Sequence, residues 1–189
     1  MIQERSQNIT GQLFLLIIFI ILFDQVTKTW AYLYLRGYDL FGNSRDFVLI
    51  KNIFRLTYIE NPGIAFGIRV GNEIFLTLFA TISSILLLYI LFQIDTGQTS
   101  YKYALGCIIG GAFGNLVDRF IYGKVIDFIY LEFINWPVFN VADIAVTIGM
   151  FLGIFQLFDS HRQEPIDDAD EEKVVWINGE KISSDEVIQ

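Results

Sequence analysis

The stretch from Gly110 to Asp143, GGAFGNLVDRFIYGKVIDFIYLEFINWPVFNVAD, decides how the rest of the chain is interpreted. Its acidic side chains Asp118, Asp127 and Asp143 lie within or beside some of the most apolar sequence of the protein. An ionisable group at membrane depth costs roughly 2.5–3.5 kcal/mol on insertion scales, so such groups are rarely present without a task. We therefore ask what the surrounding chain is, and then what these residues do in it.

The composition is that of a membrane protein. Hydrophobic residues make up 53% of the 189 residues and aromatic residues 16%, with a mean hydropathy of +0.48, well above the average of soluble domains. The net charge of -8 is uneven: residues 159–189 hold 10 acidic and 3 basic side chains (3 - 10 = -7), and residues 1–158 hold 11 and 10 (10 - 11 = -1). No basic cluster indicates a nucleic-acid partner. We expect one membrane domain over residues 1–158 and an acidic, mostly solvated tail over residues 159–189.

Four apolar segments are long enough to cross a membrane, which takes about 20 residues per helix. The sequence predicts helices over residues 13–35, 74–92, 103–122 and 138–158. The third is rich in glycine, which lets neighbouring helices approach closely. We therefore predict an integral membrane α-helical protein, an antiparallel four-helix bundle with both termini on one side.

The links between these spans have characters of their own. Residues 36–72 contain a β-branched and aromatic core, Phe47–Ile59, which predicts a small β-sheet on the membrane surface. Residues 124–137 are aromatic and predict an interfacial segment before the fourth helix. In the tail, Asn178-Gly179 predicts the turn of a hairpin. The Lys and Arg count of the loops places the 36–72 link on the inside by a small margin.

Several polar residues of the spans indicate a structural network. Asp24 and Lys28 are spaced i, i+4, so they share a helix face and can form an ion pair. Asn115 and Asp118 follow Gly111 on one stripe of the third helix. We expect Asn115 to hydrogen-bond across helices.

For Asp118 we expect a partner beside it in sequence. Arg119 is its neighbour, and an arginine at this distance keeps a carboxylate ionised and occupied. We therefore expect Asp118 and Arg119 to neutralise each other at the membrane boundary. Such a pair suits a scaffold better than proton transfer.

Two other aspartates, Asp127 and Asp143, have no adjacent cation in the sequence. Asp143 lies i, i+3 from Asn140 on the predicted fourth helix. Two carboxylates brought together near hydrocarbon share a proton, and one can then act as general base while the other acts as general acid. The alternative is that Asp127 is an interfacial surface residue and Asp143 belongs to an ion or proton path. From spacing alone the two interpretations are equally supported. The chain lacks the Cys/His set of a zinc site, and we predict no metal or cofactor.

Taken together, these residues resemble those of a known family. Five blocks, in order, are similar to the motifs of the bacterial lipoprotein signal peptidases (signal peptidase II): Asp24–Lys28, Asn61–Phe66, Gly110–Arg119, Val125–Phe128 and Phe139–Asp143. One block would be a weak signal, but five in order with four spans around them are highly specific.

The resemblance implies an intramembrane aspartyl endopeptidase that cleaves diacylglyceryl-modified prolipoproteins just before the lipidated cysteine. It implies Asp127 and Asp143 as the catalytic pair. The supporting and substrate-binding residues that it implies are Asp24, Lys28, Asn61, Gly63, Gly111, Asn115, Asp118, Arg119 and Asn140. The acidic tail has no counterpart in the family motifs.

The resemblance also implies partners and a location. The partners are lipidated prolipoproteins, membrane lipid and cyclic depsipeptide inhibitors such as globomycin. The location is the bacterial cytoplasmic (inner) membrane, with cytoplasmic termini and with the active site and sheet on the outer side, which opposes the small charge bias. Two other classes remain as alternatives: a non-enzymatic four-helix ion or proton transporter, which lacks a visible internal repeat, and a membrane scaffold.

Overall fold

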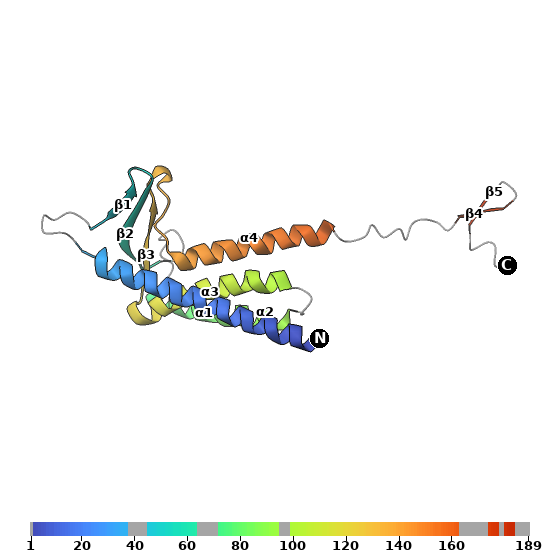
Figure 1. Ribbon diagram of the computed structural model, residues 1–189, viewed down its shortest axis with the longest axis horizontal. Helices are drawn as coiled ribbons and strands as arrows, with labels where there is room; N and C mark the ends of the chain where they lie inside the picture. Colours follow the sequence, from blue (N-terminus) through green and yellow to red (C-terminus); the bar gives the residue numbers. More distant parts are fainter. Residues whose placement is uncertain are drawn as a thin grey trace. The chain divides into compact units, whose positions relative to one another are not determined.

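The structure is a computed structural model that describes residues 2–37, 45–63, 72–94, 99–162, 174–177 and 180–183. The chain divides into two compact units, Met1–Ile154 and Phe155–Gln189, which we describe separately. The four long helices are α1 (Ile2–Tyr34), α2 (Glu73–Gln93), α3 (Thr99–Tyr122) and α4 (Val141–Arg162). In the first unit they run beside one another, with a β-sheet at the end where α1 stops and α4 starts (Figure 1).

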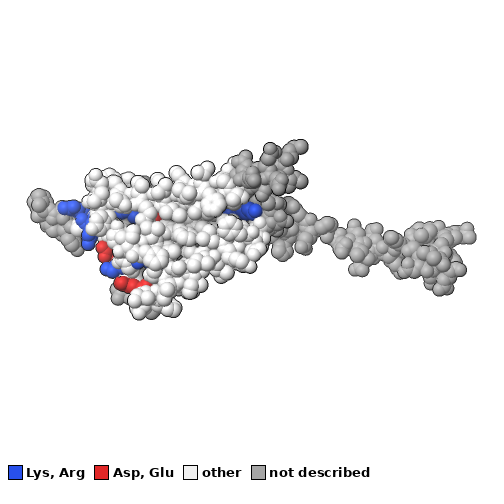
Figure 2. All heavy atoms as spheres, turned by 90° about the horizontal axis from the view of Figure 1, so that it is seen from below, with Lys and Arg blue, Asp and Glu red and all other residues white. Residues whose placement is uncertain are grey.

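Each helix contains a segment long and apolar enough to cross a membrane, which confirms the four predicted spans. These segments are Thr10–Tyr34, Glu73–Gln93, Thr99–Tyr122 and Val141–Phe158. The share of buried residues is 44% in the third and between 11% and 22% in the others, so most apolar side chains face outward. On the face shown in Figure 2, charged side chains gather towards the ends and leave most of the helical surface uncharged. Such a surface matches hydrocarbon rather than water.

Helix α3 is the most buried of the four because its glycines let other helices come close. A Cβ atom at Gly110 would lie 2.9 Å from Cβ of Ile20 on α1, and one at Gly111 would lie 2.3 Å from the carbonyl oxygen of Ala142 on α4. Close backbone approach through small residues is the usual packing mode within membranes. The glycine-rich third span was expected to play this role, and these two contacts confirm it.

A three-stranded antiparallel sheet caps this end of the bundle. Its strands are β1 (Phe47–Ile50), β2 (Phe54–Asn61) and β3 (Val125–Leu131), in the order β1-β2-β3. The first two confirm the sheet predicted within residues 36–72. Phe128 of β3 packs with Ala31 and Leu35, so the sheet rests on the end of α1.

The third strand corrects the prediction for residues 124–137. Val125–Leu131 was expected to belong to an interfacial segment, but it pairs with β2 along its length. Its first four residues are all buried. A strand covered on both faces has no alternation of apolar and polar residues, and a short apolar run of this kind is not recognised by its periodicity.

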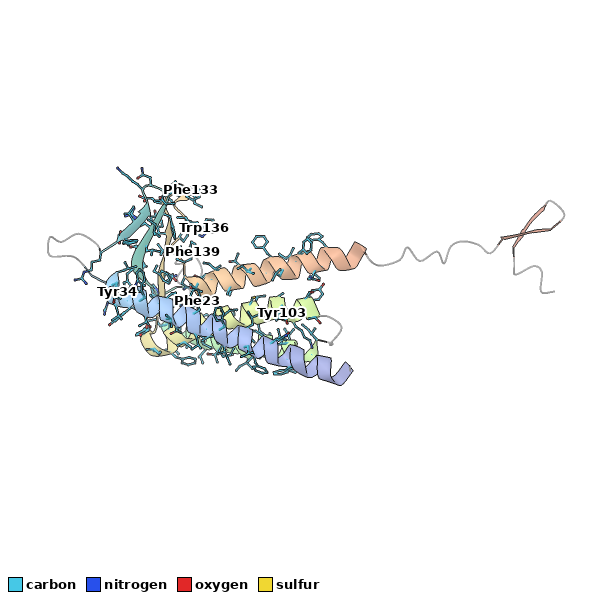
Figure 3. The ribbon with its side chains drawn as sticks, viewed as in Figure 1. Phe23, Tyr34, Tyr103, Phe133, Trp136 and Phe139 are labelled. Atoms are coloured by element: carbon cyan, nitrogen blue, oxygen red, sulfur yellow. The ribbon has the colours of Figure 1, made fainter. Side chains whose placement is uncertain are left out.

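The remainder of that link keeps the interfacial character that was predicted. The short 3-10 helix η2 (Glu132–Ile134) follows β3. Phe133 within this helix and Trp136 after it are both exposed. Figure 3 shows these two side chains at the sheet end of the bundle, with Tyr34 at the end of α1 and Tyr103 towards the other end of the helices. Aromatic side chains at both ends of spanning helices are typical of membrane interfaces.

The second unit contains the predicted hairpin strands. Strand β4 (Val174–Ile177) pairs antiparallel with β5 (Glu180–Ser183), with Trp176 opposite Lys181. The predicted turn residues Asn178 and Gly179 lie outside the described residues, as does most of the acidic tail.

Candidate active site

Asp127 and Asp143 line one cavity, as the dyad hypothesis requires. Asp127 lies on β3 opposite Ile59 of β2, and Asp143 lies in the first turn of α4. The cavity has a volume of about 550 Å³ and extends from these carboxyl groups into the space lined by α2, α3 and α4. Asn61, Asn115 and Arg119 share its wall. The fold thus gathers the polar residues of four elements around one hollow.

Three asparagine side chains direct the two carboxyl groups. Asp127 is 2% exposed; its Oδ2 accepts a hydrogen bond from Nδ2 of Asn61 at 2.9 Å, and its Oδ1 accepts one from Nδ2 of Asn140 at 2.7 Å. Oδ1 of Asp143 accepts a hydrogen bond from Nδ2 of Asn115 at 2.8 Å. In each of the three asparagines the side-chain oxygen accepts a hydrogen bond from another donor, which leaves the side-chain nitrogen to face a carboxylate.

Two of those oxygens are held by main-chain groups. The backbone N–H of Gly63 donates to Oδ1 of Asn61 at 2.9 Å. The backbone N–H of Asp143 donates to Oδ1 of Asn140 at 3.0 Å, and the N–H of Asn140 donates back to Oδ2 of Asp143 at 3.2 Å. This exchange has the form of a capping box at the start of a helix.

Asn140 therefore differs from its predicted position. The fourth helix was expected to start at residue 138, which would have placed Asn140 within it. Helix α4 begins at Val141, so Asn140 precedes the helix and caps it. The reason is that asparagine side chains compete with the helix for backbone hydrogen bonds and favour cap positions. In this position Asn140 links both aspartates.

The side-chain oxygen of Asn115, the third of these asparagines, accepts a hydrogen bond from a lysine in a buried charge cluster. Lys28 lies 2.7 Å from Asp24 and 2.9 Å from Asp118, and its Nζ donates to Oδ1 of Asn115 at 2.9 Å. The predicted Asp24–Lys28 pair is thus confirmed. The cluster also ties the site together, because Asp24 accepts a hydrogen bond from the N–H of Ala142 at 2.9 Å. Lys28 acts on the site through Asn115, whose Nδ2 is left to face Asp143.

The predicted pairing of Asp118 with Arg119 is wrong. Asp118 is paired with Lys28 of α1, and it also accepts a hydrogen bond from the N–H of Ile126 at 3.0 Å. Arg119 instead donates to the carbonyl oxygens of Asn115 at 3.3 Å and Gly63 at 3.2 Å. Residues adjacent in a helix do not face each other, which separates their side chains. Arg119 consequently faces the cavity.

Gly111 brings the two sides of the site together. Its hypothetical Cβ atom would lie 2.3 Å from the carbonyl oxygen of Ala142 and 2.8 Å from Cγ2 of Val146. Only a residue without a side chain lets α3 approach α4 this closely, and that approach places Asn115 beside Asp143. The glycine is needed here for packing.

The protonation of Asp127 suits acid–base chemistry. Burial and, secondly, the charge of Asp143 raise the pKa of Asp127 to about 7, whereas hydrogen bonds from Asn61 and Asn140 lower it. A carboxyl group of this kind holds a proton near neutral pH and can act as a general acid. The arrangement therefore supports one acid and one base.

One supporting residue was missed from the sequence. Nε2 of Gln25 donates to Oδ1 of Asp118 at 2.9 Å and to the carbonyl oxygen of Gly114 at 3.0 Å. The signal was a polar residue next to Asp24 inside an apolar span.

Among the described residues, no group of three or more His, Cys, Asp or Glu side chains could hold a metal ion. Of the predicted second block, residues 64–66 lie outside the described residues.

The sequence and the fold are both similar to those of known proteins. Residues 16–159 match the family described as signal peptidase (SPase) II. The chain belongs to the signal peptidase II family. It is 37% identical over 141 residues to the lipoprotein signal peptidase of Clostridium tetani, which covers 73% of this chain and 86% of that protein. It is 38% identical over 150 residues to that of Halothermothrix orenii, covering 79% and 97%.

Solved structures agree with the fold. A bacterial membrane enzyme determined by the in meso method at 2.3 Å resolution is similar with a TM-score of 0.70 and 32% identity, over 82% of this chain and 92% of that one. A second such structure, at 1.9 Å resolution, gives a TM-score of 0.65 and 33% identity, over 78% and 92%. The resemblance stated from the sequence is confirmed, and the chain is a multi-pass membrane peptidase. The transporter alternative finds no support in these comparisons.

Proposed function

We propose that the protein is an aspartyl endopeptidase that removes the signal peptide of diacylglyceryl-modified prolipoproteins, cutting just before the lipidated cysteine. Family membership and relatives named lipoprotein signal peptidase support the cleavage of lipoprotein signal peptides. The aspartyl mechanism rests mainly on one observation, that Asp127 and Asp143 line one cavity and are directed by three asparagine side chains.

The two carboxyl groups divide the chemistry between them. Asp143 acts as the general base and accepts a proton from a water molecule whose oxygen attacks the scissile carbonyl carbon. Protonated Asp127 donates its proton to the leaving nitrogen as the C–N bond breaks, in keeping with a pKa of about 7. The proton on Asp143 then passes back within the pair and resets it. Arg119 positions the wall beside them by binding the carbonyl oxygens of Gly63 and Asn115.

Under this proposal the termini are cytoplasmic and the sheet lies on the outer side of the bacterial inner membrane. The loop charge count opposed that orientation, but several of the cations counted have acidic partners. Arg55 lies 3.1 Å from Asp46 and 2.6 Å from Glu132, and Lys124 lies 3.2 Å from Glu60. Paired cations contribute little net positive charge. Arg69, which was also counted, lies outside the described residues.

The cavity also fits the proposed partners. Apolar residues of α2 and α4 make up much of its wall below the carboxyl groups, so acyl chains and a membrane-embedded peptide can enter from the bilayer. A cyclic depsipeptide such as globomycin is expected to compete for the same space.

The assay is cleavage of a lipidated prolipoprotein by purified enzyme in detergent, with the unlipidated precursor and globomycin as comparisons. Asp127→Asn and Asp143→Asn are each expected to reduce kcat by at least about 10²–10⁴-fold, the usual contribution of a general acid or base. Asp46→Asn is the matched control, because Asp46 pairs with Arg55 on the sheet and is outside the cavity wall. Near-normal turnover in either active-site variant would contradict the proposal.

A further inference from the structure

The hydroxyl group of Ser84 has no hydrogen-bond partner among the described residues. Ser84 lies on α2 and is 1% exposed, and no described donor or acceptor pairs with its Oγ. A helical Ser or Thr commonly donates to the carbonyl one turn earlier, as Thr81 does to Thr77 at 2.7 Å. Among the described side chains, the one other buried polar atom without a partner is Nε of Arg55, on the sheet. A buried hydroxyl left unpaired lowers stability, so its presence requires an explanation.

Ser84 lines the same cavity as the catalytic pair. Much of the wall that α2, α3 and α4 contribute to this cavity is apolar, with Phe79, Val146 and Met150 among its residues, and Ser83 lines it as well. Thr147 also lines the cavity, but its hydroxyl already donates to the carbonyl oxygen of Asp143 at 2.8 Å. The Ser84 hydroxyl is therefore an unused hydrogen-bond donor in the wall of the cavity.

The cavity extends well below the dyad. Met150 lies about 10 Å further along α4 than Asp143, at a rise of about 1.5 Å per residue, and both residues line the cavity. An extended peptide covers that depth with about three residues, at about 3.3 Å each. A substrate chain cut at the dyad can thus reach this depth within a few residues of the cut.

Given the proposed function, the substrate contains main-chain carbonyl groups that require a hydrogen-bond donor. A signal peptide must be helical within hydrocarbon, because no water is present to satisfy its backbone. It must also be extended at the scissile bond, so its helix has to end inside the enzyme. The last four carbonyl groups of any helix have no donor within the helix. Where its helix ends, the substrate therefore has main-chain carbonyl groups without a donor, and the enzyme has the Ser84 hydroxyl without an acceptor.

We propose that the Ser84 hydroxyl donates a hydrogen bond to a main-chain carbonyl in the last turn of the bound signal-peptide helix. Ser84 is then a positioning residue. It fixes where the peptide leaves its helix and so which peptide bond arrives between Asp127 and Asp143. This assignment deepens the proposed function and rests on it.

The test compares Ser84→Ala with Thr81→Val, since Thr81 lies on the same helix outside the cavity wall and its hydroxyl already donates to the carbonyl oxygen of Thr77 at 2.7 Å. For a lipidated prolipoprotein, Ser84→Ala should raise KM by about five- to tenfold, the loss of one hydrogen bond, with kcat within about twofold because the bond is made equally in ground and transition states. Thr81→Val should leave both constants within about twofold. The melting temperature of Ser84→Ala should be equal to or above that of the wild type, because an unpaired hydroxyl is removed.

Two results would overturn this inference. One is an unchanged KM, or an equal rise in both variants. The other is a lower melting temperature together with an unchanged ratio of KM to kcat, which is what a purely structural hydroxyl gives.

A further arm excludes the ester carbonyls of the diacylglyceryl group. A lipidated peptide that begins with the modified cysteine, and so has no signal peptide, should inhibit the wild type and Ser84→Ala with equal Ki. A Ki that rises with KM would assign the hydroxyl to the lipid instead and reject the proposal. The same assay on Asp127→Asn tests the dyad separately: its turnover can fail or survive without altering the KM comparison at Ser84.

Discussion

Replacing Lys28 by methionine tests the buried charge cluster that orients the site. Lys28 is 1% exposed and lies 2.7 Å from Asp24 and 2.9 Å from Asp118, both of which are also buried. Methionine fills a similar length but has no charge. The substitution leaves two carboxylates facing each other without a cation. It also removes one of the two donors to the side-chain oxygen of Asn115, so that only Nδ2 of Asn140, at 3.0 Å, still donates to it.

The expected loss follows from that geometry. Removing one partner of a buried ion pair costs about 3–5 kcal/mol, because the remaining charge is left uncompensated. For a chain of this size that loss corresponds to a fall in melting temperature on the order of 10 °C. Turnover should also fall, because Asn115, which donates to Asp143, is then held by one hydrogen bond to its oxygen instead of two.

Thermal unfolding in detergent, followed by intrinsic fluorescence, measures the effect. Lys124→Met is the matched control, since Lys124 pairs with Glu60 at 3.2 Å but its side chain is 38% exposed. An exposed pair contributes about 0–1 kcal/mol, so the control should shift little. Equal and small shifts in both variants would refute the role assigned to Lys28.

Two further predictions concern pH and packing. Because the folded state raises the pKa of Asp127 to about 7 from 3.8, it binds a proton more tightly than the unfolded state, and its contribution to stability is complete below pH 3.8 and is lost as pH rises through about 7. The free energy of unfolding should fall by about 2–3 kcal/mol from this group between pH 5 and pH 8, and Asp127→Asn should abolish that part; the same slope in the variant would rule out this source. Gly111→Ala should destabilise the protein by about 1–3 kcal/mol through overpacking against the carbonyl of Ala142, whereas Gly106→Ala, which meets only ordinary contacts, should unfold near the wild-type temperature.

Patterns local in the chain were sufficient for much of the fold. Apolar runs of spanning length predicted the four helices, because a lipid environment demands continuous hydrophobicity. The pair Asp24–Lys28 was predictable because i, i+4 spacing alone brings the two side chains together. The candidate dyad was selected by a local property too, the absence of a cation beside Asp127 and Asp143.

What the sequence could not determine depends on contacts between distant segments. The partner of Asp118 is on another helix, so the adjacent Arg119 was a misleading choice. Strand β3 exists because β2 offers it a pairing edge, and its buried sequence shows no alternation of its own. The orphan hydroxyl of Ser84 is defined by what surrounds it.

The stretch from Gly110 to Asp143 combines both kinds of information. By itself the sequence determined that this stretch concentrates ionisable side chains in apolar surroundings, and it thereby indicated where a functional site should be sought. Only the tertiary structure decided how the charges divide: Asp118 to the Lys28 cluster, Arg119 to the cavity wall, and Asp127 with Asp143 to a shared hollow. The physical reason is that burial, hydrogen-bond partners and electrostatic neighbours are set by packing, and packing brings together residues that the chain itself keeps apart.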